Sequence, residues 1–130
     1  MAHIRVVAAV IERAGKLLVC QRPTHKRHGG LWEFPGGKTE PGEDDFAAVS
    51  RELREELDVD VVSVAAEAYR IEDHGSEFVI AFIPTVISGE PRPLEHQNLA
   101  WAGAHELTMI DLAPSDEAFV LHHLSSGTGE

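Results

Sequence analysis

The stretch GGKTEPGEDDFAAVSRELREELDV, residues 36–59, constrains this chain more than any other segment. It places three glutamates, Glu52, Glu55 and Glu56, between positions 52 and 56. Acidic residues followed by regularly spaced apolar ones predict a helix from about Asp44 to Leu57, because acidic side chains are favourable near a helix N-terminus. Like charges three and four positions apart on a helix repel each other. A helix with this sequence therefore carries a local electrostatic penalty that needs a reason.

A helical arrangement at about 100° per residue separates two faces of this segment. The predicted core stripe consists of Phe46, Val49, Leu53 and Leu57. The glutamates fall on a neighbouring arc, where Ala48 leaves space one turn before Glu52. We therefore expect the glutamates to converge beside the core and not to scatter over the exposed face.

Two interpretations of the glutamates stand equal on this pattern alone. The first is a solvated acidic face, although such faces usually alternate in sign because opposite charges stabilise a helix and like charges destabilise it. The second is a metal site with hard oxygen ligands, which would suit Mg²⁺ or Mn²⁺ together with substrate phosphates. Zinc is disfavoured because no histidine stands at a ligand spacing from these carboxylates.

The spacing of the whole stretch decides between these interpretations. It has a glycine at position 37, Glu43, the triplet Arg51-Glu52-Leu53, and Glu55-Glu56 before Asp58-Val59. This pattern resembles the Nudix box of the Nudix hydrolase superfamily. One position departs from it, since the family has glycine where this chain has Asp58. The flanking sequence LWEFPGGK resembles the MutT-like branch of nucleoside triphosphate pyrophosphohydrolases, close to its group acting on CTP and modified nucleotides.

The resemblance implies a loop–helix–loop that binds divalent metal. It makes Glu52, Glu55 and Glu56 the metal-binding and base-type carboxylates. Further ligands would be the carbonyl of Gly36 and Glu95 on a later loop. The remaining residues that it implicates are an orienting ion pair, Glu43 and Arg51, and two cations facing the phosphates, Arg22 and Lys38.

Asp116 is a further candidate, because the MutT-like branch places an asparagine or aspartate after a proline at the start of its last helix to contact the base. The sequence LAPSDEAF puts Pro114, Ser115 and Asp116 there. Helix capping is an equally weighted interpretation, since serine and aspartate are both preferred caps. Arg22 and Glu95 likewise have an alternative as ordinary surface residues, and we assign none of the eight histidines to catalysis.

The rest of the chain predicts an α+β domain. Extended segments are expected at residues 3–11, 17–22, 31–38, 59–71, 77–87 and 99–103. A second helix is expected at 113–124, followed by a frayed tail at 125–130. Strands, a helix, more strands and a final helix describe one domain over residues 1–124, with a mixed sheet between helices as in the Nudix fold.

Composition limits the functions that remain. The net charge of −11 argues against nucleic-acid polymers as partners, although a divalent cation can still recruit a phosphorylated small molecule. No membrane span or signal peptide is expected, and the lone Cys20 is expected to be a buried thiol of a cytoplasmic protein. The chain is expected to be a monomer or homodimer.

The leading hypothesis is Mg²⁺-dependent hydrolysis of nucleoside triphosphates, including modified or oxidised ones, to nucleoside monophosphate and pyrophosphate. An alternative keeps the Nudix chemistry but takes ADP-ribose or a dinucleoside polyphosphate. A third, disfavoured alternative is a non-catalytic nucleotide sensor, because sensors of this fold generally lack glutamates of the box and this chain has them all.

Overall fold

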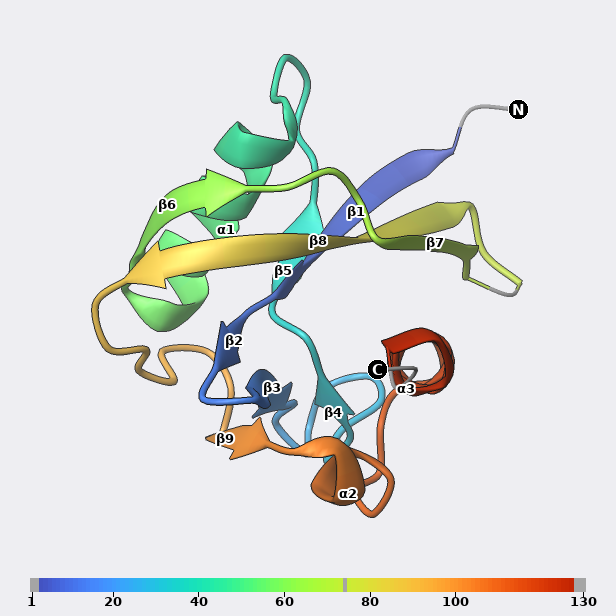
Figure 1. Ribbon diagram of the computed structural model, residues 1–130. Coiled ribbons are helices and arrows are strands. Elements are labelled where there is room, and N and C mark those ends of the chain that lie inside the picture. The colour runs from blue at the N-terminus through green and yellow to red at the C-terminus, as the bar shows by residue number, and fades with distance from the viewer. Residues whose placement is uncertain (1–2, 74, 128–130) are drawn as a thin grey trace.

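The computed structural model describes residues 3–73 and 75–127, and it contains two sheets and three helices (Figure 1). The larger sheet has the order β5–β1–β8–β6, and β7 pairs with the other half of the long strand β8. Its strands are β1 (Ile4–Val10), β5 (Gly36–Lys38), β6 (Asp60–Val64), β7 (Tyr69–Glu72) and β8 (Phe78–Ser88). The pair β1–β8 is parallel and the others are antiparallel, so the mixed sheet predicted from the sequence is confirmed.

The smaller sheet pairs β3 with three neighbours, and all of its pairs are antiparallel. Its strands are β2 (Glu12–Arg13), β3 (Lys16–Gln21), β4 (Trp32–Glu33) and β9 (Asn98–Ala102). The chain passes from β4 to β5 through Phe34 and Pro35, and so crosses from one sheet to the other within LWEFPGGK. The single interrupted strand expected there is two strands of different sheets, and Gly36–Lys38 is one of them.

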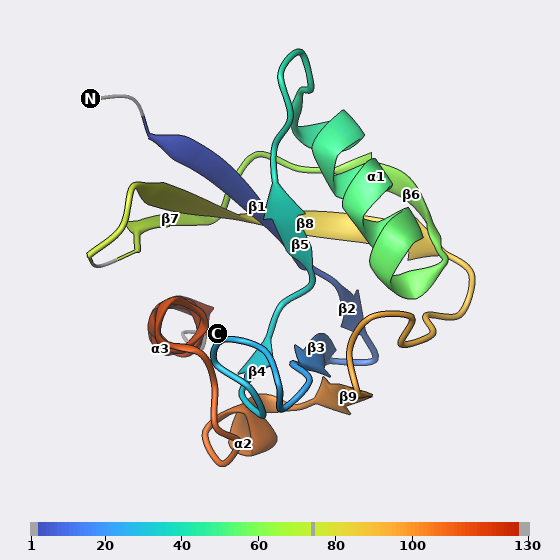
Figure 2. The same cartoon turned by 180° about the vertical axis from the view of Figure 1, so that it is seen from behind.

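Helix α1 (Asp45–Leu57) and helix α3 (Pro114–Gly127) lie on opposite sides of the larger sheet, with β8 between them in both views (Figures 1 and 2). The short helix α2 (Ala104–Leu107) was not expected from the sequence. Helix α3 continues through Gly127, past the expected start of a frayed tail at residue 125, and residues 128–130 lie outside the described residues. Among the described residues, no helix combines the length and apolar character needed to cross a membrane.

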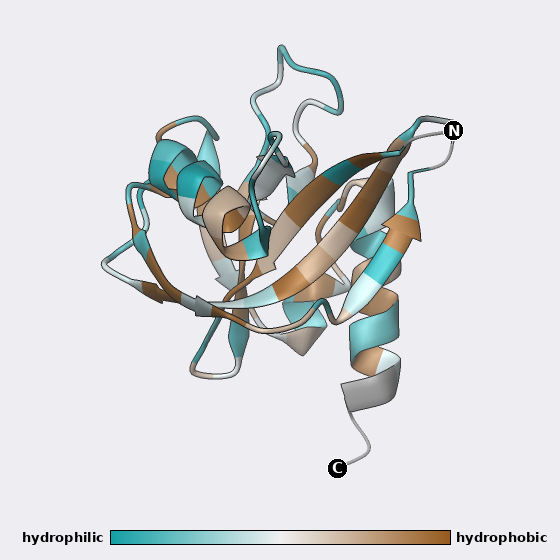
Figure 3. Ribbon diagram, turned by 90° about the horizontal axis from the view of Figure 1, so that it is seen from above, coloured by the Kyte–Doolittle hydropathy of each residue, from teal (hydrophilic) through white to brown (hydrophobic). Residues whose placement is uncertain are grey.

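The central strands are buried on both faces, which explains their nearly continuous apolar sequences (Figure 3). Val7 of β1 packs toward α1, and the next residue, Ala8, packs toward α3. In β8, Ala81 and Phe82 divide in the same way. The lone Cys20 is fully buried in the core on the α1 side, as predicted, and burial raises the pKa of its thiol.

The predicted buried face of α1 needs one correction. Val49, Leu53 and Leu57 are buried as expected, but Phe46 in the first turn is 44% exposed and Ala48 is fully buried in its place. A methyl side chain lets this helix approach the sheet closely, which turns the apolar face away from Phe46 and toward the glutamates. Glu56 consequently belongs to the buried face of α1, with only 6% of its surface exposed.

Candidate functional site

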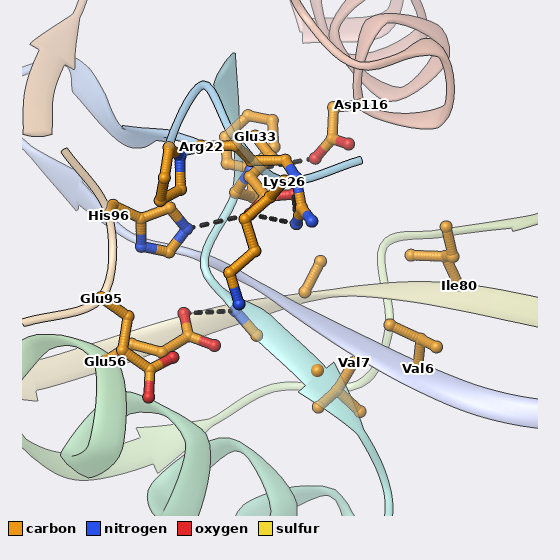
Figure 4. Close-up of a pocket in the computed structure, with 15 residues that line it drawn as sticks. Val6, Val7, Arg22, Lys26, Glu33, Glu56, Ile80, Glu95, His96 and Asp116 are labelled. Carbon is orange, nitrogen blue, oxygen red and sulfur yellow. Dashed lines mark hydrogen bonds and ion pairs between the residues drawn. The ribbon is translucent and has the colours of Figure 1, made fainter. Parts of the chain in front are cut away.

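A cavity of about 270 Å³ opens where the larger sheet, α1, α3 and two loops meet (Figure 4). Residues distant in the sequence line it, among them Arg22, Gly36, Glu56, Glu95 and Asp116. All five were site candidates from the sequence, so the fold brings together the acidic helix, the loop after β8 and the start of α3. Glu56 and Glu95 lie at one end of the cavity and Asp116 at the other (Figure 4).

The acidic end is built on two hydrogen-bonded carboxyl groups, Glu52 and Glu56. One oxygen of Glu56 also accepts a hydrogen bond from the backbone N–H of Gly36 at 3.3 Å. Burial, the largest cause, and the adjacent Glu52 together raise the pKa of Glu56 to about 10, which favours its neutral form. Two neighbouring carboxyl groups, one of them buried, disfavour ionisation of both, and a divalent cation bound beside them would reverse that preference.

The two glycines of β5 make room for this pair. A Cβ on Gly37 would lie 2.4 Å from one carboxylate oxygen of Glu52, so glycine allows Glu52 to lie directly against the strand. Gly36 has a φ of 153°, and a Cβ there would lie 1.9 Å from the backbone oxygen of Val7. Any larger residue at either position would displace the strand or the carboxylate.

Arg51 and Glu43 form the ion pair that the resemblance implies. The guanidinium of Arg51 donates to both carboxylate oxygens of Glu43, at 2.7 and 3.0 Å, which holds the pKa of Glu43 down at about 2. It also donates to the carbonyl of Lys38 at 2.9 Å and to Glu52 at 3.0 Å. Arg51 therefore ties the loop before α1, strand β5 and the carboxylate pair into one unit.

Glu55 stands apart from the buried pair. Its side chain is 52% exposed and lies 3.6 Å from Arg51. Within the described part of the chain, no three acidic, histidine or cysteine side chains are already gathered at the separations of a metal cluster. The carboxylate oxygens of Glu52 and Glu56 and the carbonyl oxygen of Gly36 are nevertheless the type of ligand that a hard divalent cation prefers.

The loop that carries Glu95 is attached to the end of α1 by two backbone hydrogen bonds. The N–H of Arg92 donates to the carbonyl of Leu57 at 2.9 Å, and the N–H of Leu94 donates to the carbonyl of Glu56 at 3.0 Å. These bonds hold Glu95 beside the glutamates of the helix, as Figure 4 shows for Glu56. The loop also satisfies carbonyls that the last turn of a helix leaves free.

Arg22 lines the cavity as predicted, within a polar cluster that the sequence did not reveal. Its guanidinium lies 3.3 Å from the Glu33 carboxylate and donates to the carbonyl of Arg27 at 2.7 Å. Glu33 also lies 2.9 Å from Nε2 of His96, a side chain that is only 7% exposed. Nδ1 of His96 is buried without a hydrogen-bond partner among the described residues. No spacing in the sequence links Glu33 to His96, because loop contacts and not a motif bring them together.

The lysine that lines the cavity is Lys26 and not the predicted Lys38. The ammonium of Lys38 lies 5.2 Å from the ring centre of Phe78, outside the residues that line the cavity, so the prediction that it faces the phosphates is not supported. Lys26, on the loop between β3 and β4, lines the cavity and points toward Glu56 and Glu95 (Figure 4). No motif in the sequence pointed to Lys26.

Asp116 lies inside α3 and not at its cap. One oxygen of Asp116 accepts a hydrogen bond from the backbone N–H of Phe34 at 2.9 Å, and burial raises the pKa of its carboxyl to about 8. Ser115 is also buried and donates to Asp73 at 3.1 Å. The interpretation of either residue as the helix cap is therefore wrong, since the helix already begins at Pro114.

Comparison with known families gives a match to the NUDIX domain over residues 1–123. The chain belongs to the Nudix family. An Escherichia coli protein named CTP pyrophosphohydrolase is 40% identical over 127 residues, which cover 92% of this chain and 93% of the relative. An 8-oxo-dGTP diphosphatase of Haemophilus influenzae is 32% identical, over 96% of this chain and 93% of that protein.

Solved structures of Nudix proteins share the same architecture. The solution structure of the E. coli ORF135 protein superposes with a TM-score of 0.81 at 35% identity, over all of this chain and 96% of that one. A MutT structure from a study of Aliivibrio salmonicida and Vibrio cholerae gives a TM-score of 0.81 at 27% identity, over 95% of this chain and 98% of that one. The predicted Nudix fold and the MutT-like resemblance are thus confirmed.

Proposed function

We propose that this Nudix protein hydrolyses nucleoside triphosphates to nucleoside monophosphate and pyrophosphate in the presence of Mg²⁺. The observation that carries the proposal is the buried Glu56 beside the largely buried Glu52, at the end of a cavity that also contains Arg22. A buried Glu56 next to a second carboxyl group is costly to ionise unless a cation relieves the repulsion. Relatives named CTP pyrophosphohydrolase and 8-oxo-dGTP diphosphatase support this substrate class.

The metal ligands in this proposal are the carboxylates of Glu52, Glu55, Glu56 and Glu95 with the carbonyl of Gly36. Bound Mg²⁺ would neutralise phosphate charge and lower the pKa of water, and Mn²⁺ has the same ligand preferences. A glutamate of the cluster accepts the proton as water attacks phosphorus. The bond from that phosphorus to the oxygen bridging the α- and β-phosphates breaks, so one water is consumed and nucleoside monophosphate and pyrophosphate form.

Arg51 and Glu43 act indirectly in this scheme. They fix the loop and α1 relative to β5, and Arg51 holds Glu52 in position through a 3.0 Å hydrogen bond. Catalysis of phosphoryl transfer depends mainly on positioning and charge neutralisation, so loosening this ion pair reduces turnover without removing a reacting group. Arg22, held by Glu33, supplies positive charge to the phosphates.

The base lies at the other end of the cavity in this proposal. A second, smaller cavity of about 160 Å³ adjoins the first and shares Arg22, Glu33, Ile80 and Asp116 with it. Ile80 and Phe34 offer apolar contact, and Asp116 offers the hydrogen-bonding group. Modified bases, including oxidised ones, are candidate substrates because a relative is named 8-oxo-dGTP diphosphatase and the second cavity adds space beside Asp116.

The test is pyrophosphate and phosphate release from a panel of nucleotides with Mg²⁺. The panel contains the common nucleoside triphosphates, 8-oxo-dGTP, ADP-ribose and a dinucleoside tetraphosphate, ranked by kcat/KM. We expect the triphosphates to rank first and to release pyrophosphate. A higher kcat/KM for ADP-ribose or the dinucleoside would assign the protein to another substrate class, and no turnover of any compound would support a sensor.

A further inference from the structure

The loop between β3 and β4 is closed tightly at its base. The N–H of Arg22 donates to the carbonyl of Leu31 and the N–H of Gly30 donates to the carbonyl of Arg22, both at 2.9 Å. Gly29 packs against the backbone of Thr24, where a Cβ would lie 2.3 Å from the carbonyl oxygen. The loop is therefore a compact unit that presents Lys26 in a defined direction.

The side chain of Lys26 is directed into the cavity (Figure 4). The backbone N–H of Lys26 donates to the carbonyl of Pro23 at 3.1 Å. The ammonium of Lys26 has no hydrogen bond or ion pair to any residue that the structure describes. In Figure 4 the side chain extends toward Glu56 and Glu95. The cavity of about 270 Å³, which Lys26 and these carboxylates line together, has room for a third group that contacts both.

The chemistry of that third group follows from the charges on each side. The carboxylates favour a divalent cation, and a polyphosphate is an anion that can contact both the cation and an ammonium. Lysine binds phosphate as a compact point charge with three donors. The other candidate lysine, Lys38, is turned onto Phe78 and does not line the cavity.

We propose that Lys26 binds the phosphates beyond the α-phosphate of the nucleotide, and so distinguishes triphosphate substrate from monophosphate product. This inference rests on the proposed function. The loop holds Lys26 opposite the metal-binding carboxylates, and Arg22 at the base of the same loop is fixed by Glu33 and the carbonyl of Arg27. Hydrolysis removes the phosphates that Lys26 contacts, which weakens the binding of the product.

The experiment measures binding by calorimetry with Mg²⁺ and two probes. One is a cytidine triphosphate analogue with a methylene group between the α and β phosphorus atoms, and the other is cytidine monophosphate. For Lys26→Ala we expect the Kd of the analogue to rise about tenfold or more, because a hydrogen bond to a charged group is lost, and that of the monophosphate to stay within about twofold. Lys26→Arg retains the charge and should restore most of the affinity.

Lys16→Ala is the matched control, since it removes the same charge from the start of β3, outside the cavity. It should leave both Kd values unchanged, which excludes an effect of net charge alone. Equal weakening of both probes in Lys26→Ala, no weakening of either, or a larger loss in Lys38→Ala would overturn the inference. Wild-type protein that neither binds the analogue nor hydrolyses triphosphates would overturn the proposed function as well.

Discussion

The carboxylate of Asp58, at the left-handed end of α1, forms an ion pair with the guanidinium of Arg92. The φ of Asp58 is 58° and its ψ is 45°, and its N–H closes the helix on the carbonyl of Arg54. The Nudix box has glycine at this position, and glycine adopts a left-handed backbone without the steric penalty that aspartate incurs. The sequence did not reveal the partner, which comes from the loop that also carries Glu95.

Asp58→Gly should change stability little in the wild-type background. Relief of the left-handed strain contributes about 1 kcal/mol or less for aspartate, while loss of an exposed ion pair costs about 0–1 kcal/mol. In the Arg92→Ala background the relief is opposed only by the exposed, 3.9 Å pair of Asp58 with Arg54, and we expect stabilisation by about 0.5–1 kcal/mol. Urea denaturation of the four proteins in this double-mutant cycle measures both values. Equal effects of Asp58→Gly in the two backgrounds would show that the ion pair contributes nothing.

Replacement of the buried glutamate should separate activity from stability. Glu56→Gln keeps an acceptor for the N–H of Gly36 and gains an amide donor toward Glu52, so we expect the melting temperature of the metal-free protein to be equal or higher. The kcat should fall by about 10²–10⁴, the range for a positioned catalytic group. We expect Glu55→Gln to lower kcat within the same range. Glu72→Gln, an exposed change on β7, is the control. Full activity of Glu56→Gln with Mg²⁺ would exclude Glu56 from the metal site.

The raised pKa of Glu56 makes the metal-free protein less stable as pH rises. The pKa of a glutamate in an unfolded chain is about 4.3, whereas the pKa of Glu56 in the folded protein is raised to about 10. Between these values the folded state binds more protons, so the free energy of unfolding decreases with increasing pH. Mg²⁺ favours the ionised pair and should stabilise the protein more at about pH 8 than at about pH 6.

Thermal unfolding in EDTA and in Mg²⁺ at both pH values checks this prediction. The raised pKa of Asp116 gives a slope of the same sign, so the informative quantity is the difference between wild type and Glu56→Gln. The variant should show a flatter pH dependence without metal and a smaller gain from Mg²⁺. Identical pH profiles for the two proteins would mean that Glu56 is ionised in the metal-free fold.

Local spacing made much of this site predictable. The Nudix box put Glu52 and Glu56 side by side and paired Arg51 with Glu43, and the structure has both contacts because one helix and the loop before it determine their geometry. The role of the two glutamates as metal ligands stays a prediction. Helical periodicity alone erred at Phe46, since the depth at which a helix meets a sheet depends on residues of both. Helical periodicity also predicted that Glu56 lies beside the core, whereas Glu56 is part of the buried face of α1.

Residues brought in by loops could not be predicted in the same way. The carboxylate of Glu33 contacts the ring of His96, which is 63 positions away in the sequence. Lys26 lines the cavity on a loop that closes where Gly29 packs against Thr24. Lys38 was assigned by its place in the motif, but its side chain follows the strand to Phe78. Side-chain direction on a strand depends on register, which the motif does not contain.

Base selection should depend on the protonation state of Asp116. Its carboxyl is buried, accepts one hydrogen bond from Phe34 and has a pKa raised to about 8, so it is mostly neutral at pH 7. An ionised carboxylate only accepts hydrogen bonds and favours a base edge with an amino group, such as that of cytosine. A neutral carboxyl can also donate to a carbonyl, such as that of uracil.

We therefore expect a preference for CTP over UTP that increases as pH rises from about 6.5 to 8.5, with the steepest change near the pKa of Asp116. The ratio of kcat/KM for the two nucleotides at each pH measures it, since effects on the shared phosphate chemistry cancel in the ratio. Asp116→Asn removes the titrating group and should give a ratio independent of pH, while Asp116→Ala should compress the preference by about tenfold, the value of one good contact. A pH-independent ratio in the wild type, or an unchanged ranking in Asp116→Ala with a loss of thermal stability alone, would assign Asp116 to fixing Phe34 and place base recognition elsewhere.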